Sequence, residues 1–326
     1  MTEDRTFAVQ LEAPVASRAI HIVAAASGRG APDVGCGLGP EALLRSSFMT
    51  RLKQAGLRTR WDATLPPASH AEPLSAVRDV CARLGDRVLG IMRSGARPFV
   101  LSGDHSCAIG AWNGVAQAVR SRGSLGLIWI DAHMDAHQPS TSHSGALHGM
   151  PLACLLGYGD PNLLALADVP ALSPENVCLV GVRSFEPEEQ SFLAGLGVRV
   201  FYMEEIARRG LADVMAEAHA IASRGSAGFG VTLDVDALDP QDAPGVGSPE
   251  PGGLRAVELL GELATIGRDP RLLAVEITEY NPLHDHDGRT AGVVSELAVA
   301  LLGGERRVTR TRSADQARSN GIAAAA

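Results

Sequence analysis

Aromatic residues are scarce in this sequence, and long apolar runs are absent. Phe, Trp and Tyr make up 4% of the 326 residues, whereas hydrophobic residues as a whole make up 45%. A large core is therefore available, but it has to be built mainly from Ala, Val, Leu and Ile. No window approaches the roughly 18–20 apolar residues of a membrane span, and the start "MTEDRTFAVQ" lacks the pattern of a signal peptide. We expect a cytoplasmic protein with no membrane partner.

Clusters of basic residues and paired cysteines are also missing. The formal net charge is −8, and no basic cluster is interleaved with aromatics, so we expect no nucleic-acid partner. This acidic balance is compatible with a cationic substrate. The cysteines are odd in number, form no C-x-x-C motif and lie in apolar surroundings, which predicts reduced thiols in the core. They are Cys36, Cys81, Cys107, Cys154 and Cys178.

Short apolar runs alternate along the chain with longer segments of helical period. Strands are predicted over 20–26, 98–103, 125–131, 177–182, 198–203, 229–236 and 272–278. Most of these runs are continuously apolar, as strands buried on both faces require. Helices are predicted over 40–55, 74–94, 106–121, 149–156, 186–195, 204–223, 254–267 and 290–302. The alternation predicts an α/β fold with a mostly parallel sheet covered by helices on both faces.

One domain is expected over residues 1–303, because no repeat or linker divides this part of the chain. Segment 304–326 has few large apolar residues and is predicted to be a surface extension or a disordered tail. A Gly-rich segment, "SGRGAPDVGCGLG" (27–39), follows the first strand but lacks the spacing of phosphate-binding loops. We interpret it as a loop near a site.

Carboxylates and imidazoles stand where four of the predicted strands end. The motifs are "DHS" (Asp104, His105), "DAHMDAH" (Asp131, His133, Asp135, His137), "DVDALDP" (Asp234, Asp236, Asp239) and "TEYNP" (Glu279). Any one of them alone fits a helix cap or a turn. In an open α/β sheet, however, the carboxyl ends of the strands share one edge. So many anionic groups at one edge repel one another unless a cation neutralises them.

A divalent metal cluster is the simplest explanation of this edge. Carboxylates dominate the set, with two imidazoles and no thiolate, which favours a hard, high-coordination ion such as Mn²⁺ over a structural Zn²⁺. Carboxylates that can bridge suggest two metal ions ~3.5–4 Å apart, sharing one activated water.

In their order and approximate spacing, these motifs resemble those of the arginase-like ureohydrolases. The matching stretches are "SGDHS", "DAHMDAH", "SGALHG", "DVDALDP…GVGSPEPGGL" and "EYNP", with "GLGPEALLRS" after the first strand. The resemblance covers about residues 20–302. It implies a three-layer α/β/α sandwich around an eight-stranded sheet, and a homo-oligomer, trimer or hexamer. It also implies Mn²⁺-dependent hydrolysis of a guanidino compound to urea and an amine.

The resemblance implies roles for individual residues as well. One metal ion would be held by His105, Asp131, Asp135 and Asp234, and the other by Asp131, His133, Asp234 and Asp236, so that Asp131 and Asp234 bridge. A metal-bridging hydroxide would attack the guanidinium carbon. His148 matches the family's acid/base histidine, and Glu279 matches the carboxylate that orients the guanidinium. Asp135 is counted with these two as catalytic.

The end of the site that reads the rest of the substrate departs from the family pattern. Ser144 is retained, and Ser248 stands where the family has Thr. His137 and Ala146, however, replace two Asn residues that normally hold the α-carboxylate. The family's "R-D-x-D-P" segment reads "RSFEP", which leaves Glu186 as the candidate for an ammonium group. His137 either holds a carboxylate or is a solvated loop residue, and both interpretations stay open.

Several functions fit these residues. The loop "HQPSTSHSGALHG" and the motif "EYNP" favour the arginase branch, and hence hydrolysis of L-arginine to L-ornithine and urea. The alternative is a ureohydrolase for another guanidino acid (guanidinobutyrate or a modified arginine) or for agmatine. Two hypotheses from other classes are a non-catalytic binding protein and a single-metal deacetylase on a related fold. The deacetylase would not need His105 and Asp135 as ligands.

Overall fold

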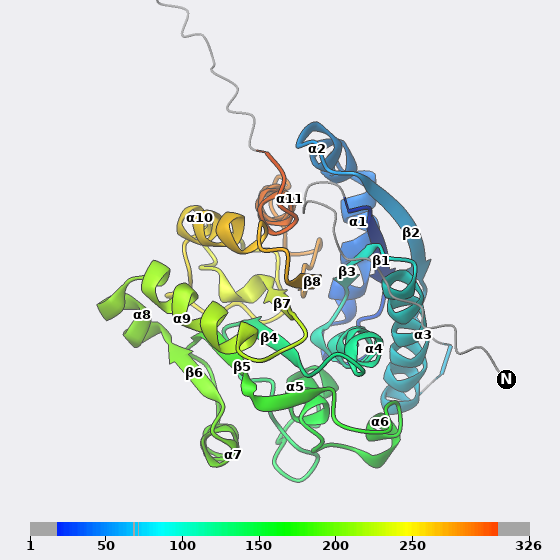
Figure 1. Cartoon of the computed structure of the whole chain (residues 1–326), viewed down its shortest axis with the longest axis vertical. Coiled ribbons are helices and arrows are strands. Elements are labelled where there is room, and N and C mark those ends of the chain that lie inside the picture. Colours follow the sequence, from blue (N-terminus) through cyan, green and yellow to red (C-terminus); the bar gives the residue numbers. More distant parts are fainter. Residues whose placement is uncertain (1–17, 68, 71, 306–326) are drawn as a thin grey trace, which may run out of the picture.

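An eight-stranded sheet lies at the centre of the computed structural model, which describes residues 18–67, 69–70 and 72–305 (Figure 1). All neighbouring strands run parallel, in the order β2-β1-β3-β8-β7-β4-β5-β6. The strands are β1 (Ile20–Ala25), β2 (Thr59–Leu65), β3 (Arg97–Ser102), β4 (Leu125–Ile130), β5 (Leu172–Val182), β6 (Arg199–Tyr202), β7 (Phe229–Asp234) and β8 (Leu272–Thr278). The expected eight-stranded α/β fold is confirmed, and the sheet is wholly rather than mostly parallel.

Helices cover both faces of the sheet, because most of its strands are apolar on both sides. One face packs against α1 (Gly39–Arg45), α2 (Phe48–Gln54), α8 (Met203–Arg209), α9 (Leu211–Ser223), α10 (Ala256–Ile266) and α11 (Arg289–Leu301). The other packs against α3 (Pro73–Arg93), α4 (Ala108–Val119), α5 (Pro151–Leu155), α6 (Pro161–Leu164) and α7 (Pro187–Leu196). Successive strand residues alternate between the layers: Ile22 belongs to the first core and Val23 to the second. Within the described residues, no helix combines the length and apolar character needed to cross a membrane.

Two strands depart from the sequence-based predictions, the edge strand β2 and the first half of the inner strand β5. Strand β2 was not predicted, because it is an edge strand that is only partly buried and carries the Arg60–Asp62 ion pair instead of an apolar run. Strand β5 begins at Leu172 rather than at 177, since Pro174 and Glu175 interrupt the apolar pattern of its first half. Polar residues on a half-exposed strand thus hide it from a search for buried runs.

Two of the predicted helices are each divided in two. The helix expected over 40–55 breaks at Ser46, whose hydroxyl oxygen accepts a hydrogen bond from the amide of Phe48 (3.1 Å). The helix expected over 204–223 breaks at Gly210, whose φ of +87° is a conformation that favours glycine. The one-turn helix α6 was not predicted, and the remaining helices match the predicted ranges to within two residues at each end.

Two other expectations concern the cysteines and the C-terminal tail. All five cysteines are free and buried, which confirms the prediction of reduced core thiols. The predicted tail lies outside the described residues from position 306 onward. The domain boundary at 303 therefore stays a prediction.

The four strands whose ends carry the polar motifs are neighbours in the sheet. They form the central block β3-β8-β7-β4, although they lie far apart in the sequence. Because neighbouring strands are parallel, their carboxyl ends meet at one edge. This topology brings the Asp, His and Glu residues of four separate motifs into a single site.

Candidate metal and catalytic site

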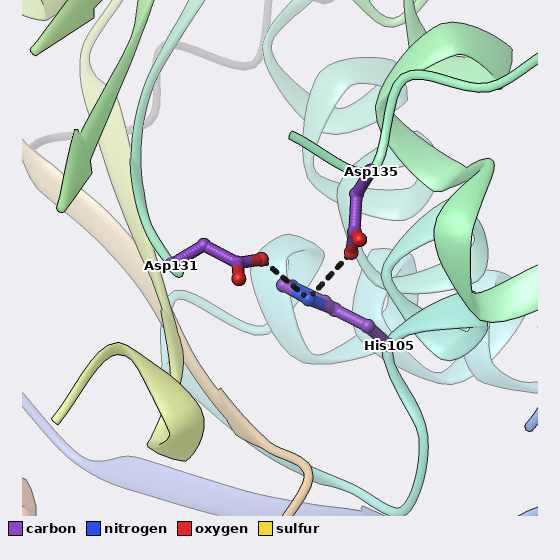
Figure 2. A group of neighbouring side chains, drawn as sticks. All are labelled: His105, Asp131 and Asp135. Carbon is purple, nitrogen blue, oxygen red and sulfur yellow. Dashed lines mark ion pairs between the residues drawn. The ribbon is translucent and has the colours of Figure 1, made fainter. Parts of the chain in front are cut away.

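The imidazole of His105 lies at the centre of a group of carboxylates. His105 Nδ1 is 2.9 Å from Asp135 Oδ2 and 3.0 Å from Asp234 Oδ2. A third carboxylate oxygen, Asp131 Oδ2, is 3.1 Å away. Figure 2 shows the ring between the carboxylates of Asp131 and Asp135, which come from the segment after β4. Residues expected to hold one metal ion thus converge on a single point.

A second group adjoins the first through Asp131. His133 Nδ1 is 3.1 Å from Asp236 Oδ2 and 3.5 Å from Asp131 Oδ1. Asp131 therefore directs one carboxylate oxygen toward each imidazole. These three residues form a second candidate ligand group, with ligand atoms within 4.8 Å of one another. Asp234 contacts the first group, and its Oδ1 accepts the amide hydrogen of Asp236 (2.8 Å).

The donor set fits a metal centre. His105 Nδ1 and Asp135 Oδ2 are both buried, yet neither has a hydrogen-bond partner of acceptable geometry. Burial together with neighbouring carboxylates raises the pKa of Asp234 and of Asp236, because each charge is costly without a cation. A divalent cation would bind these unpartnered nitrogen and oxygen atoms and neutralise the buried acids around them.

The backbone holds two of these side chains in an unusual conformation. Asp135 and Glu279 have φ values of +50° and +64°, and they are two of the three described non-glycine residues with positive φ. Such conformations cost about 1–3 kcal/mol each and persist where the surroundings impose them. Their coincidence with the site indicates that side-chain direction matters there.

A buried polar network stands behind His105, and the sequence analysis missed it. His105 Nε2 lies 3.1 Å from the Thr232 hydroxyl, which donates to Glu276 Oε2 (2.9 Å). Glu276 is fully buried in β8 and also accepts hydrogen bonds from Ser102 Oγ (2.6 Å) and Trp112 Nε1 (2.8 Å). The sequence feature that could have indicated the network is Glu276, a single glutamate inside the apolar run "LLAVEIT".

Glu279 and His148 form a pair beside the metal ligands. Glu279 Oε1 lies 3.1 Å from His148 Nδ1 and accepts the amide hydrogen of His105 (2.9 Å). Glu279 Oε2 accepts a hydrogen bond from the Cys36 thiol (2.9 Å), a contact between the Gly-rich loop and the site that the sequence did not indicate. Burial alone would lower the pKa of His148, but Glu279 raises it to about 9. The same pair holds the pKa of Glu279 below its usual value, against the effect of burial.

A cavity of about 200 Å³ opens over this cluster and contains the remaining predicted residues. Ser144 and Ser248 line it, and so do His137 and Glu186 at its outer end. His137 Nε2 is 3.0 Å from Glu186 Oε2. Glu189, which the sequence analysis did not select, also lines the cavity and is buried. The sequence did contain a sign of it: Glu189 is the last acid of "EPEE" and forms the capping box of α7 with Glu186.

The fold and the site define a metal-dependent hydrolase of the ureohydrolase type, and comparison with known proteins agrees. The model of the arginase family matches residues 18–303. The arginase of Brevibacillus brevis is 38% identical over 283 residues, which cover 84% of this chain and 94% of that protein. This chain therefore belongs to the arginase family.

Solved structures give the same result. The crystal structure of arginase from Bacillus subtilis superimposes with a TM-score of 0.83 at 33% sequence identity, and the match covers 89% of this chain and 100% of that one. The arginase of Entamoeba histolytica, in complex with L-ornithine, has a TM-score of 0.82 at 28% identity, over 88% of this chain and 99% of that one. The expected family resemblance is confirmed over nearly the whole described chain.

Proposed function

We propose that this enzyme hydrolyses L-arginine to L-ornithine and urea at a binuclear Mn²⁺ centre. The observation that carries the proposal is the convergence of three carboxylate oxygens within 3.1 Å of His105 Nδ1, directly beside Glu279. The arginases of Brevibacillus brevis and Bacillus subtilis support arginine as the substrate, and the L-ornithine complex of the Entamoeba enzyme supports the product.

The ligands proposed for the two ions are those expected from the motifs. His105, Asp131, Asp135 and Asp234 would hold one ion, and Asp131, His133, Asp234 and Asp236 the other. Four carboxylates and two imidazoles without a thiolate favour Mn²⁺. When bound, the ions would offset the carboxylate charge and supply Lewis acidity and an activated water.

Glu279 and His148 would act on the guanidinium group itself. The buried carboxylate of Glu279 is ionised, and a planar guanidinium pairs with a carboxylate through parallel N–H bonds. That contact would orient the reacting carbon toward the cluster. His148 is protonated at neutral pH through its contact with Glu279, so it would donate the proton that the departing amine requires.

Urea release tests the proposal directly. The protein is stripped with a chelator, reloaded with Mn²⁺, and assayed with L-arginine while bound metal is counted. We expect urea formation with two ions per chain. Asp236→Asn should lower turnover by about 100-fold, equal to about 2.7 kcal/mol. The control is Asp239→Asn, since Asp239 accepts hydrogen bonds from backbone amides of Gln241 and Gly252 outside the cluster.

The outcomes separate the alternatives. Urea from guanidinobutyrate but not from L-arginine would support the other guanidino-acid hypothesis. A single zinc ion per chain would support the deacetylase, and no turnover with metal bound would support a binding protein. Cytoplasmic location and a trimer or hexamer stay predictions, the latter to be measured by sedimentation.

A further inference from the structure

The outer end of the catalytic cavity is acidic, and this bears on substrate choice; the inference rests on the function proposed above. The cavity lined by Asp234 and Asp236 continues to His137, Glu186 and Glu189. No Lys or Arg is among its lining residues in the described part of the chain. A guanidino substrate with its reacting carbon at the cluster would extend its other end toward these three side chains. Their chemistry therefore decides which substrate tail is accepted.

His137 is already occupied by protein partners. Its Nε2 lies 3.0 Å from Glu186 Oε2, and its Nδ1 lies 3.1 Å from the Thr141 hydroxyl. The ring is also largely buried, with 9% of the residue exposed. A substrate carboxylate would have to displace one of these contacts to reach a ring nitrogen. His137 is thus better suited to holding Glu186 than to holding a carboxylate.

The two glutamates are fixed in place. Glu189 Oε1 accepts the amide hydrogen of Ala136 (3.0 Å), and its Oε2 accepts that of Glu186 (3.1 Å). Hydrogen bonds from Glu189 and His137 lower the pKa of Glu186, so its carboxylate is charged at neutral pH. Burial raises the pKa of Glu189 to about 8, and an ammonium group beside it would favour the ionised form. Glu186 is therefore a charged acceptor for a positive tail, and Glu189 would become one as the ammonium group binds.

A negative tail has weak alternatives. His143 and Ser144 line the cavity, but both are exposed. Glu186 is exposed as well, but its carboxylate is held by His137 and its amide by the buried Glu189. The neighbouring Arg183 is engaged elsewhere: its guanidinium donates to the carbonyl oxygens of Gly181, Asp236 and Glu250. Near Glu186, a carboxylate would also meet like charge.

We propose that this enzyme selects its substrate by a free ammonium group on the carbon where arginine carries one, and not by the carboxylate. Guanidino amines without a free carboxylate are then substrates alongside L-arginine. Glu189 is buried, whereas the side chain of Glu186 is 49% exposed. A buried acceptor that faces an amine discriminates against an analogue that lacks the amine, because the acceptor is then left unpaired. A substrate carboxylate that the protein does not contact can be removed from the substrate without such a loss.

Four compounds that differ by one group each test this with the Mn²⁺-loaded enzyme. L-Argininamide masks the carboxylate of L-arginine, agmatine lacks it, and 5-guanidinopentanoate keeps it but lacks the amine. We expect kcat/KM for the first two to remain within about 3-fold of L-arginine, and that for 5-guanidinopentanoate to fall by at least about 30-fold. Losses of more than about 30-fold with both carboxylate-modified compounds would overturn the proposal. So would full activity on 5-guanidinopentanoate.

A variant pair assigns the effect to the cavity. Glu186→Gln should lower kcat/KM for L-arginine several-fold and leave that for 5-guanidinopentanoate unchanged. Glu188→Gln is the matched control, because Glu188 lies in the same first turn of α7 but does not line the cavity. An equal loss on both substrates in Glu186→Gln would refute the assignment. If none of the four compounds yields urea, the proposed function is wrong. If L-arginine yields urea but the two carboxylate-modified compounds do not, only the proposed substrate selection is wrong.

Discussion

At the scale of single residues, the two ring nitrogens of His105 have different tasks. The Thr232 hydroxyl has one proton, and it is donated to Glu276, so its oxygen accepts from His105 Nε2–H. With the proton on Nε2, Nδ1 would be the nitrogen that offers its lone pair to a metal ion among the carboxylates. Hydrogen bonds to the far nitrogen of a ligating histidine commonly control metal affinity in this way.

Replacing Thr232 tests this role. Thr232→Val removes the hydroxyl at nearly constant shape, and we expect Mn²⁺ affinity by calorimetry to fall by about 10–100-fold. Thr232→Ser keeps the hydroxyl and should bind the metal nearly as the wild type does. Wild-type affinity in the Val variant would show that the network serves packing alone.

Cys36 acts at the other end of the site, on Glu279. Its thiol is fully buried and donates to Glu279 Oε2, while His105 N–H and His148 bind Oε1. Three short 3-10 helices, far apart in the sequence, therefore fix the plane of the carboxylate that would receive the guanidinium. A neutral hydrogen bond of this kind contributes about 1 kcal/mol.

We expect Cys36→Val to raise KM for L-arginine about 5-fold, the equivalent of that hydrogen bond, with a smaller change in kcat. Cys36→Ser keeps a donor and should restore KM. Cys178→Val is the packing control, because Cys178 is buried and its thiol points to the carbonyl oxygen of Ala218 (3.6 Å), away from the site. Equal impairment in the Ser and Val variants would remove the positioning role.

At the scale of elements, prediction from the sequence succeeded where both sides of an element are buried. Strands β3, β4, β7 and β8 are buried along their whole length and mostly apolar, and the polar residues at their ends showed where the site lies. Strand β2 was missed because a strand at the edge of a sheet is partly exposed to solvent and does not need an apolar sequence. The break between α8 and α9 was not predicted. The helical pattern of apolar residues continues through Gly210, but the backbone of Gly210 has a positive φ that interrupts the helix.

The contact between β7 and α4 gives a prediction at this scale. A Cβ on Gly230 would lie 2.1 Å from Trp112 Cζ3, and this indole donates to Glu276. Gly230→Ala should therefore lower the free energy of unfolding by about 1–3 kcal/mol in urea titrations, since the ring has to move. Gly261→Ala, in the exposed middle of α10 with open space around it, should raise stability by about 0.5–1 kcal/mol. A neutral Gly230→Ala would mean that β7 and α4 can separate freely.

At the scale of the whole molecule, contacts between residues far apart in the sequence could not be predicted from the sequence. The motifs predicted which residues gather at one edge, but not that Cys36 would touch Glu279, 243 positions away. A single buried contact leaves no periodic signal, in contrast to a strand or a helix. His137 and Glu186 were likewise selected singly, and only their approach across 49 positions revealed that they bind each other.

The metal cluster should also stabilise the entire fold. Buried carboxylates that repel one another oppose folding, and a cation bound only by the folded chain adds about 2.7 kcal/mol at a 100-fold excess over its Kd. For a chain of this size we expect Mn²⁺ to raise Tm by about 4 °C over the chelated protein. Asp234→Asn should show the reverse pattern, with a higher Tm without metal and most of the Mn²⁺ shift lost, because one buried charge and one ligand disappear together. Scanning calorimetry of both proteins, with and without Mn²⁺, measures all four values, and an identical shift in the two would exclude Asp234 as a ligand.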